Sequence, residues 1–112
     1  MPTESQLSIS EPGAAPQNVR GHSTSSTSIL VTWGEVPADK QHGEILEYTV
    51  IYKESEGDAE SKKRVDSPTR QIKLDGLKKY TEYSIQVLAA TLKGDGPRSV
   101  SIIVWTDQDG KY

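Results

Sequence analysis

The residues with the most direct capacity for chemistry in this chain are its two histidines. His22 and His42 each stand alone among polar and turn-forming residues. Catalysis requires a nucleophile beside a base, a pair of carboxylates in a pocket, or metal ligands at a workable spacing, and the sequence contains none of these patterns. We therefore expect both histidines to be solvated surface residues, and we expect no catalytic site, metal, cofactor or small-molecule substrate.

The second feature is a basic run, Lys62, Lys63 and Arg64, which has the charge to bind heparin or an acidic lipid. Acidic residues precede it at positions 54, 56, 58 and 60, so the local field is mixed. We interpret the run as part of an exposed, charged hairpin, with polyanion binding as the alternative. We expect no membrane contact by this chain itself, because no apolar run approaches the roughly 20 residues that cross a bilayer.

Length and composition limit the classes of protein further. At 112 residues, with hydrophobic residues at 33%, the chain fits one globular domain with its own core. The formal net charge of −3 provides no positive field for a polyphosphate, so we expect no nucleic-acid partner. The absence of cysteine excludes disulfides and thiolate metal sites.

Short runs of alternating apolar and polar residues have the period of half-buried strands. We expect these strands to position the histidines and the basic run. Turn-forming residues at 57–58, 75–76 and 94–97 separate several of them. The pattern predicts strands over residues 17–22, 28–33, 46–54, 70–74, 82–91 and 99–106, with a weaker one near 63–66. With the weaker strand counted, seven short strands without helices predict an all-β, two-sheet antiparallel sandwich.

The two ends of the chain differ from its middle. Residues 1–15 are rich in Ser, Glu, Pro, Gly and Ala, which predicts a flexible N-terminal linker, and residues 107–112 predict a C-terminal linker. The domain itself is expected to occupy residues 16–106. A Ser-Thr cluster at 23–28 predicts a loop.

Several segments follow one another in an order that matches a known pattern. Residues 16–19 (Pro-Gln-Asn-Val), 28–33 (Ser-Ile-Leu-Val-Thr-Trp) and 43–52 resemble the first three strands of the fibronectin type III family. Residues 77–87 resemble its tyrosine-corner segment, and residues 94–99 resemble its loop before the last strand. The resemblance spans residues 16–106. It looks closest to tandem repeats of neuronal adhesion receptors and receptor-type tyrosine phosphatases.

The resemblance and the alternation along the strands predict the same core, because residues two apart on a strand point to the same side. The inward positions are Ile29, Val31, Trp33, Tyr48, Val50, Tyr52, Ile72, Leu74, Ile85, Val87, Ala89, Ile102 and Val104. Trp33 is expected at the centre, and Leu77 is a further structural residue. The resemblance implies that Tyr83 is the corner tyrosine, with its hydroxyl bonded to nearby backbone because a buried phenol needs a partner.

Lys93, Gly94 and Asp95 form a tripeptide between the last two strands, where some fibronectin type III domains display an Arg-Gly-Asp integrin motif. The resemblance implies a protruding loop whose carboxylate completes an integrin's metal site. The alternative is that Gly94 is an ordinary turn residue and that Lys93 and Asp95 are incidental surface charges.

Strict alternation also places five apolar residues outside the core, namely Ile51, Leu88, Ala90, Ile103 and Trp105. Their strands are expected to neighbour one another in one sheet, so the five form a candidate exposed apolar stripe. Contiguous exposed apolar area usually marks a contact, here with a neighbouring domain, a second copy or a separate partner. The alternative is that single exposed apolar residues carry no function and that Trp105 packs under the linker.

These observations favour a non-catalytic interaction or adhesion module. The resemblance implies that it comes from the ectodomain of a multidomain cell-surface receptor, with an extracellular location and a protein partner, either homophilic or an adjacent domain. The alternative is a mechanical spacer in an extracellular or intracellular filament-associated protein, since the family occurs in both places. An enzyme would require a pocket with a perturbed titratable pair, for which the sequence offers no candidate residues.

Overall fold

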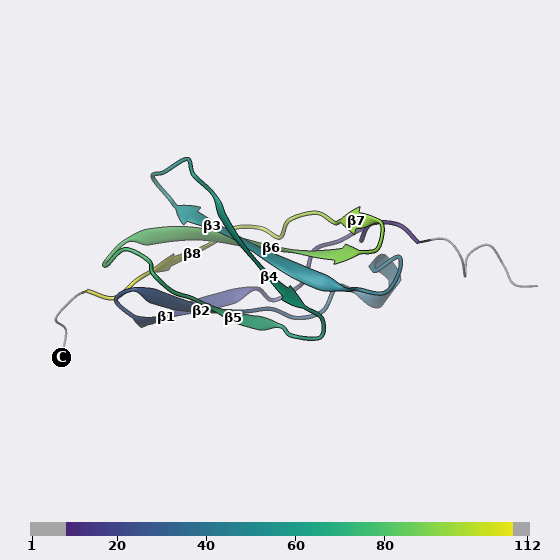
Figure 1. Ribbon diagram of the computed structural model, residues 1–112, viewed down its shortest axis with the longest axis horizontal. Coiled ribbons are helices and arrows are strands. Elements are labelled where there is room, and N and C mark those ends of the chain that lie inside the picture. Colours follow the sequence, from purple (N-terminus) through teal and green to yellow (C-terminus); the bar gives the residue numbers. More distant parts are fainter. Residues whose placement is uncertain (1–8, 109–112) are drawn as a thin grey trace, which may run out of the picture.

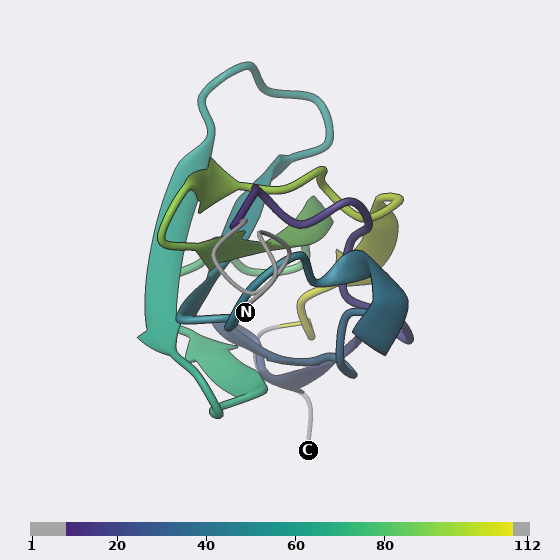
Figure 2. The same ribbon diagram turned by 90° about the vertical axis from the view of Figure 1, so that its right-hand side faces the viewer.

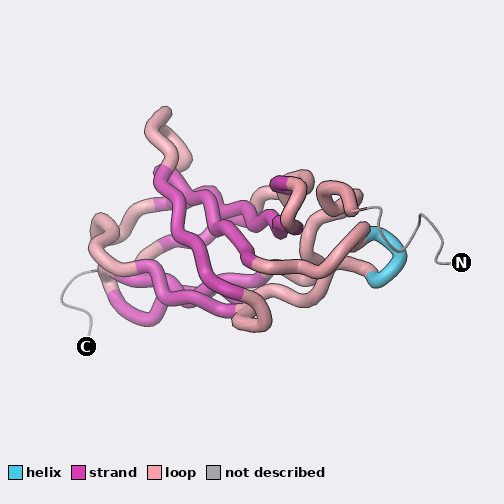
Figure 3. Tube along the Cα trace, turned by 45° about the vertical axis from the view of Figure 1, so that its right-hand side comes forward, coloured by secondary structure: helices cyan, strands magenta, loops and turns pink. Residues whose placement is uncertain are grey.

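Two antiparallel sheets form the computed structural model, which describes residues 9–108 of the chain. The three-stranded sheet contains β1 (Arg20–Ser25), β2 (Ser28–Thr32) and β5 (Gln71–Leu74). The five-stranded sheet contains β3 (Glu47–Glu54), β4 (Ser61–Asp66), β6 (Glu82–Thr91), β7 (Gly94–Asp95) and β8 (Ile102–Trp105). A single 3-10 turn in the described residues, η1 (Ala38–Lys40), lies at the N-terminal pole (Figure 3). No helix in this part of the chain has the length and apolar character to span a bilayer.

The order of the strands confirms the all-β, two-sheet antiparallel sandwich. Strand β2 lies between β1 and β5, and β4, β3 and β6 run side by side, with β7 and β8 both paired to β6. The two layers face each other in Figure 1 and in the end-on view of Figure 2. The strand predicted over residues 99–106 is shorter, as β8, and an eighth strand that was not predicted, β7, lies in the segment predicted to be a turn. The chain between β7 and β8 bonds to β6 through Gly96 and Ser99 without a continuous ladder, because Pro97 has no N–H to donate.

Strand boundaries in the first half differ from the prediction. Strand β1 runs to Ser25, so part of the Ser-Thr cluster that was predicted to be a loop is strand. The hydroxyl of Ser28 lies 2.5 Å from that of Thr24 and 2.7 Å from that of Ser25, so these polar side chains satisfy one another at the end of the hairpin. The weaker strand predicted near 63–66 is present and begins earlier, as β4.

Alternation along the strands builds the core. Its buried members are Ile29, Val31, Trp33, Val36, Tyr48, Val50, Leu74, Leu77, Tyr83, Ile85, Val87, Ala89 and Val104, with Tyr52, Ile72 and Ile102 partly buried against them. Trp33 is 5% exposed, and its ring centroid lies 5.5 Å from that of Tyr48, so this pair links the two sheets. Val36 was not predicted, because it lies in a loop beyond β2 where alternation gives no signal.

Residues 9–13 lie against the N-terminal pole, although the sequence placed them in a linker. The N–H of Ser10 donates to the carbonyl of His42 (2.9 Å), and the Thr91 hydroxyl donates to the carbonyl of Ser10 (2.7 Å). Pro12 is buried. Figure 2 shows this purple segment alongside the green hairpin at β7. We call residues 9–13 the N-terminal strap, and the domain limits of 16 and 106 stay a prediction.

Candidate protein-contact site

The candidate apolar stripe lies on the outer face of the five-stranded sheet, but most of it is covered. Ile103 and Trp105 are 52% and 50% exposed. By contrast, Ile51, Leu88 and Ala90 are only 2%, 7% and 4% exposed. The expectation that all five form one exposed stripe is therefore wrong, and the part of it available to a partner is limited to the two residues on β8.

The position of each residue within the sheet explains this difference. Ile51 on β3 lies in register between Lys62 of β4 and Gln86 of β6, and Leu88 lies beside Thr49. Long polar side chains on neighbouring strands cover apolar residues in the middle of a sheet face with their aliphatic stems. Strand β8 is paired on one side, to β6, so its outward side chains have less cover.

A third exposed apolar residue, Tyr80, adjoins Trp105 and was missed in the sequence. The two ring centroids are 5.2 Å apart with planes at 43°, and Tyr80 is 58% exposed. The only available signal was that Tyr80 is a second tyrosine in the corner segment without a core position to fill. We call Tyr80, Ile103 and Trp105 the exit patch.

The backbone of Tyr80 is itself unusual. Its φ of 46° lies in the left-handed region, which costs a non-glycine residue roughly 1–2 kcal/mol. The N–H of Tyr80 donates to the carbonyl of Asp107 (3.1 Å), so this conformation is held by a bond to the chain that follows β8. Strain retained at a surface position is a reason to look for function there.

Further hydrogen bonds fix the exit patch at the C-terminal pole. The hydroxyl of Thr106, a residue only 2% exposed, donates to the carbonyl of Lys78 (2.7 Å), and the N–H of Thr81 donates to that hydroxyl (2.9 Å). The hydroxyl of Tyr83 accepts a bond from the N–H of Lys78 (2.9 Å), which is the arrangement that the resemblance implied for a corner tyrosine. The corner and the end of β8 are thus tied together, which fixes the backbone segments that carry the two aromatic residues of the patch.

The tripeptide of Lys93, Gly94 and Asp95 does not form a protruding loop. Leu92 and Lys93 make the turn between β6 and β7, and Asp95 pairs with Ala90 in the ladder. The N-terminal strap packs against the same hairpin. Asp95 therefore lies in a strand instead of at a loop tip, contrary to the geometry that the resemblance implied, and integrin binding stays a prediction.

The basic run lies on β4, at the edge of the five-stranded sheet. Lys62, Lys63 and Arg64 are all exposed, and the Arg64 guanidinium is 3.7 Å from the carboxylate of Glu47. Exposed ion pairs of this kind contribute roughly 0–1 kcal/mol each. The run is accompanied by acidic groups, as expected for a charged hairpin, and polyanion binding stays a prediction.

The two histidines lie in different parts of the fold. His22 is an exposed residue of β1, whereas the Nδ1 of His42 lies 3.1 Å from the carbonyl oxygen of Glu11. Because a carbonyl only accepts, Nδ1 of His42 must donate, and this histidine therefore holds the N-terminal strap. Across residues 9–108, no three His, Asp or Glu side chains gather to hold a metal ion.

A shallow cleft of about 380 Å³ lies between the β3–β4 loop and the corner before β6. Both of its lysines have partners: Lys78 Nζ is 3.0 Å from the Glu54 carboxylate, and Lys53 Nζ donates to the Gly57 carbonyl (3.1 Å). The hydrogen bond to Glu54, followed by the charge of that carboxylate, raises the pKa of Lys78. A lysine acting as a general base needs a lowered pKa, so this cleft does not have the electrostatics of an acid-base site.

The sheet order, the central tryptophan and the bonded corner tyrosine occur together in a known family. The family model described as Fibronectin type III domain matches residues 14–105. The chain belongs to the fibronectin type III family. The resemblance seen in the sequence is thereby confirmed over most of the chain.

This fibronectin type III domain is similar to segments of much longer proteins. It is 41% identical over 98 residues to Tyrosine-protein phosphatase Lar of Drosophila melanogaster, 39% over 109 residues to Receptor-type tyrosine-protein phosphatase F of Mus musculus, and 40% over 102 residues to Protein sidekick-1 of Gallus gallus. These matches cover 88%, 95% and 89% of this chain but only 5%, 6% and 5% of those proteins. The domain thus corresponds to a small part of each relative.

Solved structures show the same fold. A chicken CNTN1 fragment containing domains FN1–FN3 superimposes with a TM-score of 0.80 at 28% identity, covering 88% of this chain and 33% of that one. The FN5 domain of Drosophila Lar superimposes with a TM-score of 0.70 at 37% identity, covering 86% of this chain and 97% of that one. Both comparisons support the fold of this chain.

Proposed function

We propose that this fibronectin type III domain is a non-catalytic protein-contact module in the extracellular part of a multidomain cell-surface receptor, and that the exit patch is its contact surface. The observation that carries this proposal is a half-exposed pair of aromatic rings in contact with each other. Relatives named as receptor-type phosphatases support the receptor context, and this chain covers only 6% of such a protein. Any phosphatase chemistry in a parent protein would belong to other domains.

The exit patch has the properties of a contact surface. Tyrosine and tryptophan are enriched among the residues that dominate binding energy, because each buries a large area with few rotatable bonds. Hydrogen bonds already fix the corner and β8, so binding would not have to order them. Because the patch adjoins the residues that follow β8, the fitting partners are an adjoining domain or a second copy of this domain.

Sedimentation of the domain over a wide concentration range tests the second-copy form. Self-association that Ile103→Ser and Trp105→Ser both abolish, with folding intact, would establish a contact between copies. Leu92→Ser is the matched control, since Leu92 is 75% exposed in the turn between β6 and β7, away from the patch. A monomer at every concentration would remove this form. Contact with an adjoining domain is tested by the fluorescence of Trp105 in a fragment that contains both domains. Emission as red-shifted there as in the single domain would mean that Trp105 stays in water, and it would exclude this contact.

A second function, that of a mechanical spacer, is favoured by where the chain enters and leaves. The first and last described residues lie at opposite ends of the long axis in Figure 1. Both ends are tied to the sandwich, the entering chain by the N-terminal strap and the leaving chain by the N–H of Asp107, which donates to the carbonyl of Ser25 (3.3 Å). If the exit-patch variants change neither self-association nor domain-domain contact, this spacer function is the one that stands.

A further inference from the structure

The middle of the outer sheet face is buried although no third layer covers it in the described fold. Thr49, Ile51 and Leu88 are 3%, 2% and 7% exposed, and they alternate with core residues of β3 and β6, so they face away from the core. Side chains must therefore provide their cover. We call these three residues the outer strip.

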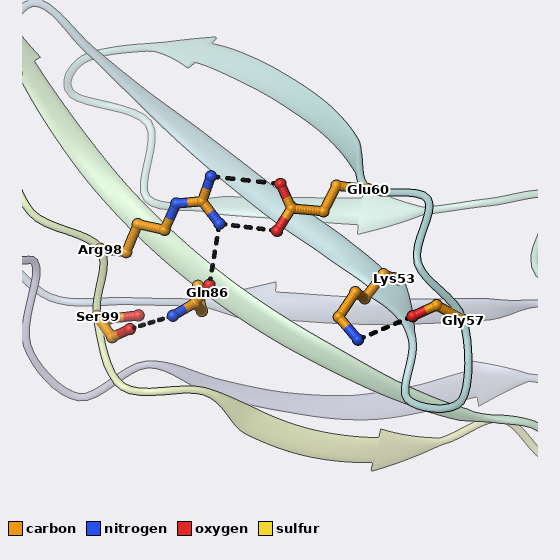
Figure 4. A network of polar contacts seen from close by, with 6 residues as sticks. All are labelled: Lys53, Gly57, Glu60, Gln86, Arg98 and Ser99. Atoms are coloured by element: carbon orange, nitrogen blue, oxygen red, sulfur yellow. Dashed lines mark hydrogen bonds and ion pairs between the residues drawn. The ribbon is translucent and has the colours of Figure 1, made fainter.

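Arg98 and Glu60 form an ion pair across this face of the sheet. The Nη1 of Arg98 lies 2.8 Å from Oε2 of Glu60, and its Nη2 lies 3.3 Å from Oε1, so the two groups make a forked pair. Arg98 follows β7 and Glu60 precedes β4, so the pair spans the two strands that lie between them in the sheet, β6 and β3. Figure 4 shows the pair above these strands.

Neighbouring residues anchor both ends of the pair. The Oε1 of Gln86 accepts a bond from the Arg98 guanidinium (3.3 Å), and its Nε2 donates to the carbonyl of Ser99 (3.0 Å). At the other end, the bond from Lys53 to Gly57 holds the loop that carries the carboxylate (Figure 4). In register, Gln86 lies directly beside Ile51 of the outer strip.

We propose that Arg98 and Glu60 act as an ionic clasp that conceals the outer strip, so that opening the clasp exposes an apolar surface on the face that also carries Ile103. The two clasp side chains are 38% and 35% exposed, so ions and water reach the pair and its closure depends on solution conditions. The clasp is formed by residues 38 positions apart in sequence, which makes it a product of the fold. This inference does not depend on the exit patch having a partner.

Binding of an anilinonaphthalene sulfonate dye tests the clasp. Arg98→Ala and Glu60→Gln should each raise dye fluorescence about threefold or more, because the dye reports exposed apolar surface. The charge-swapped double variant, Glu60→Arg with Arg98→Glu, should return the signal toward that of the natural sequence. Glu35→Gln is the matched control, since it breaks the Arg70–Glu35 pair of 2.7 Å, whose residues lie outside the clasp and the outer strip.

Two outcomes of the dye test would contradict the proposal. Folded single variants that bind no more dye than the natural sequence, or a control variant that binds as much as they do, would overturn the proposal. A variant that loses its cooperative unfolding transition is replaced in the test by the natural sequence at about 1 M salt, where screening to about 3 Å weakens the pair. Dye binding by the natural sequence that does not rise at this salt concentration, or that rises no more than when the Arg70–Glu35 pair is removed by Glu35→Gln at low salt, would equally overturn the clasp.

Discussion

Tyr80 and Trp105 contact each other at the C-terminal pole, with ring centroids 5.2 Å apart, while both residues stay at least half exposed. One ring belongs to a residue with a left-handed backbone, and the other belongs to the last residue of β8. Aromatic area left in solvent contributes nothing to folding by burial. An arrangement that retains backbone strain and leaves aromatic area in water is therefore better explained by contact than by stability.

Substitution of Tyr80 separates backbone strain from ring contact. Both Tyr80→Ala and Tyr80→Gly remove the ring, but alanine retains the left-handed penalty and glycine does not. We therefore expect the glycine variant to be more stable than the alanine variant by roughly 1 kcal/mol, measured as the free energy of unfolding in urea. Equal stability of the two variants would contradict the strained conformation.

Removal of one hydroxyl tests the corner. Tyr83→Phe deletes the acceptor for the N–H of Lys78 and leaves that donor without its bond. We expect a loss of roughly 1–2 kcal/mol in unfolding free energy, together with faster amide exchange at Lys78. Tyr52→Phe is the control, since Tyr52 is only partly buried. Unchanged protection of the Lys78 amide would show that the bond has no role.

Because of the clasp, the free energy of unfolding of the domain should fall as the pH becomes acidic. The hydrogen bond from Arg98, and then the charges of Arg98, Lys62 and Lys53 against the opposing effect of desolvation, lower the pKa of Glu60. A carboxylate whose pKa is lower in the folded state stabilises the fold above its unfolded pKa of about 4.3, and that contribution is lost as pH falls through the lower folded value. Glu60→Gln should thus reduce the drop in stability between neutral and acidic pH, measured by urea unfolding at each pH. An unchanged drop would contradict the shift.

A double-variant cycle tests the N-terminal strap. A Cβ added at Gly96 would lie 2.8 Å from the Cβ and 2.9 Å from the carbonyl oxygen of Pro12, so Gly96→Ala must push the strap away. We expect Gly96→Ala to cost roughly 1–3 kcal/mol in the complete chain and close to nothing in a chain that lacks residues 1–13. The same loss in both chains would mean that the strap does not contact the hairpin in solution.

Period-two alternation predicted which side of the sheet each residue faces, and it did so because that property is local. Ile29 and Val31 were assigned inward and are 0% exposed, and Trp33 and Tyr48 meet between the sheets. The corner tyrosine was found from the resemblance, whose spacing within residues 77–87 places Tyr83 near the N–H of Lys78.

The degree to which an outward-facing side chain is shielded from solvent, by contrast, is not a local property. Ile51 and Leu88 face outward as predicted, yet they are 2% and 7% exposed, because strands distant in sequence place long side chains beside them and no local pattern indicates which side chains these are. Tyr80 was missed for a related reason, because its left-handed backbone is bonded to Asp107, which is distant in sequence, and its own neighbours give no signal of this. The strap was predicted to be a linker because its composition is polar, although its backbone finds partners across the pole.

The three consecutive cations of β4 have a further consequence for a protein built from many similar domains. An exposed sheet edge is a template on which a misfolded neighbour can add its own strand and begin aggregation. If two copies of β4 aligned antiparallel about Lys63, Lys62 of one would stand opposite Arg64 of the other, at the roughly 5 Å spacing where like charges repel. The β4 edge thus disfavours pairing with a second copy of itself in this register, which is one way in which an exposed edge is protected against aggregation.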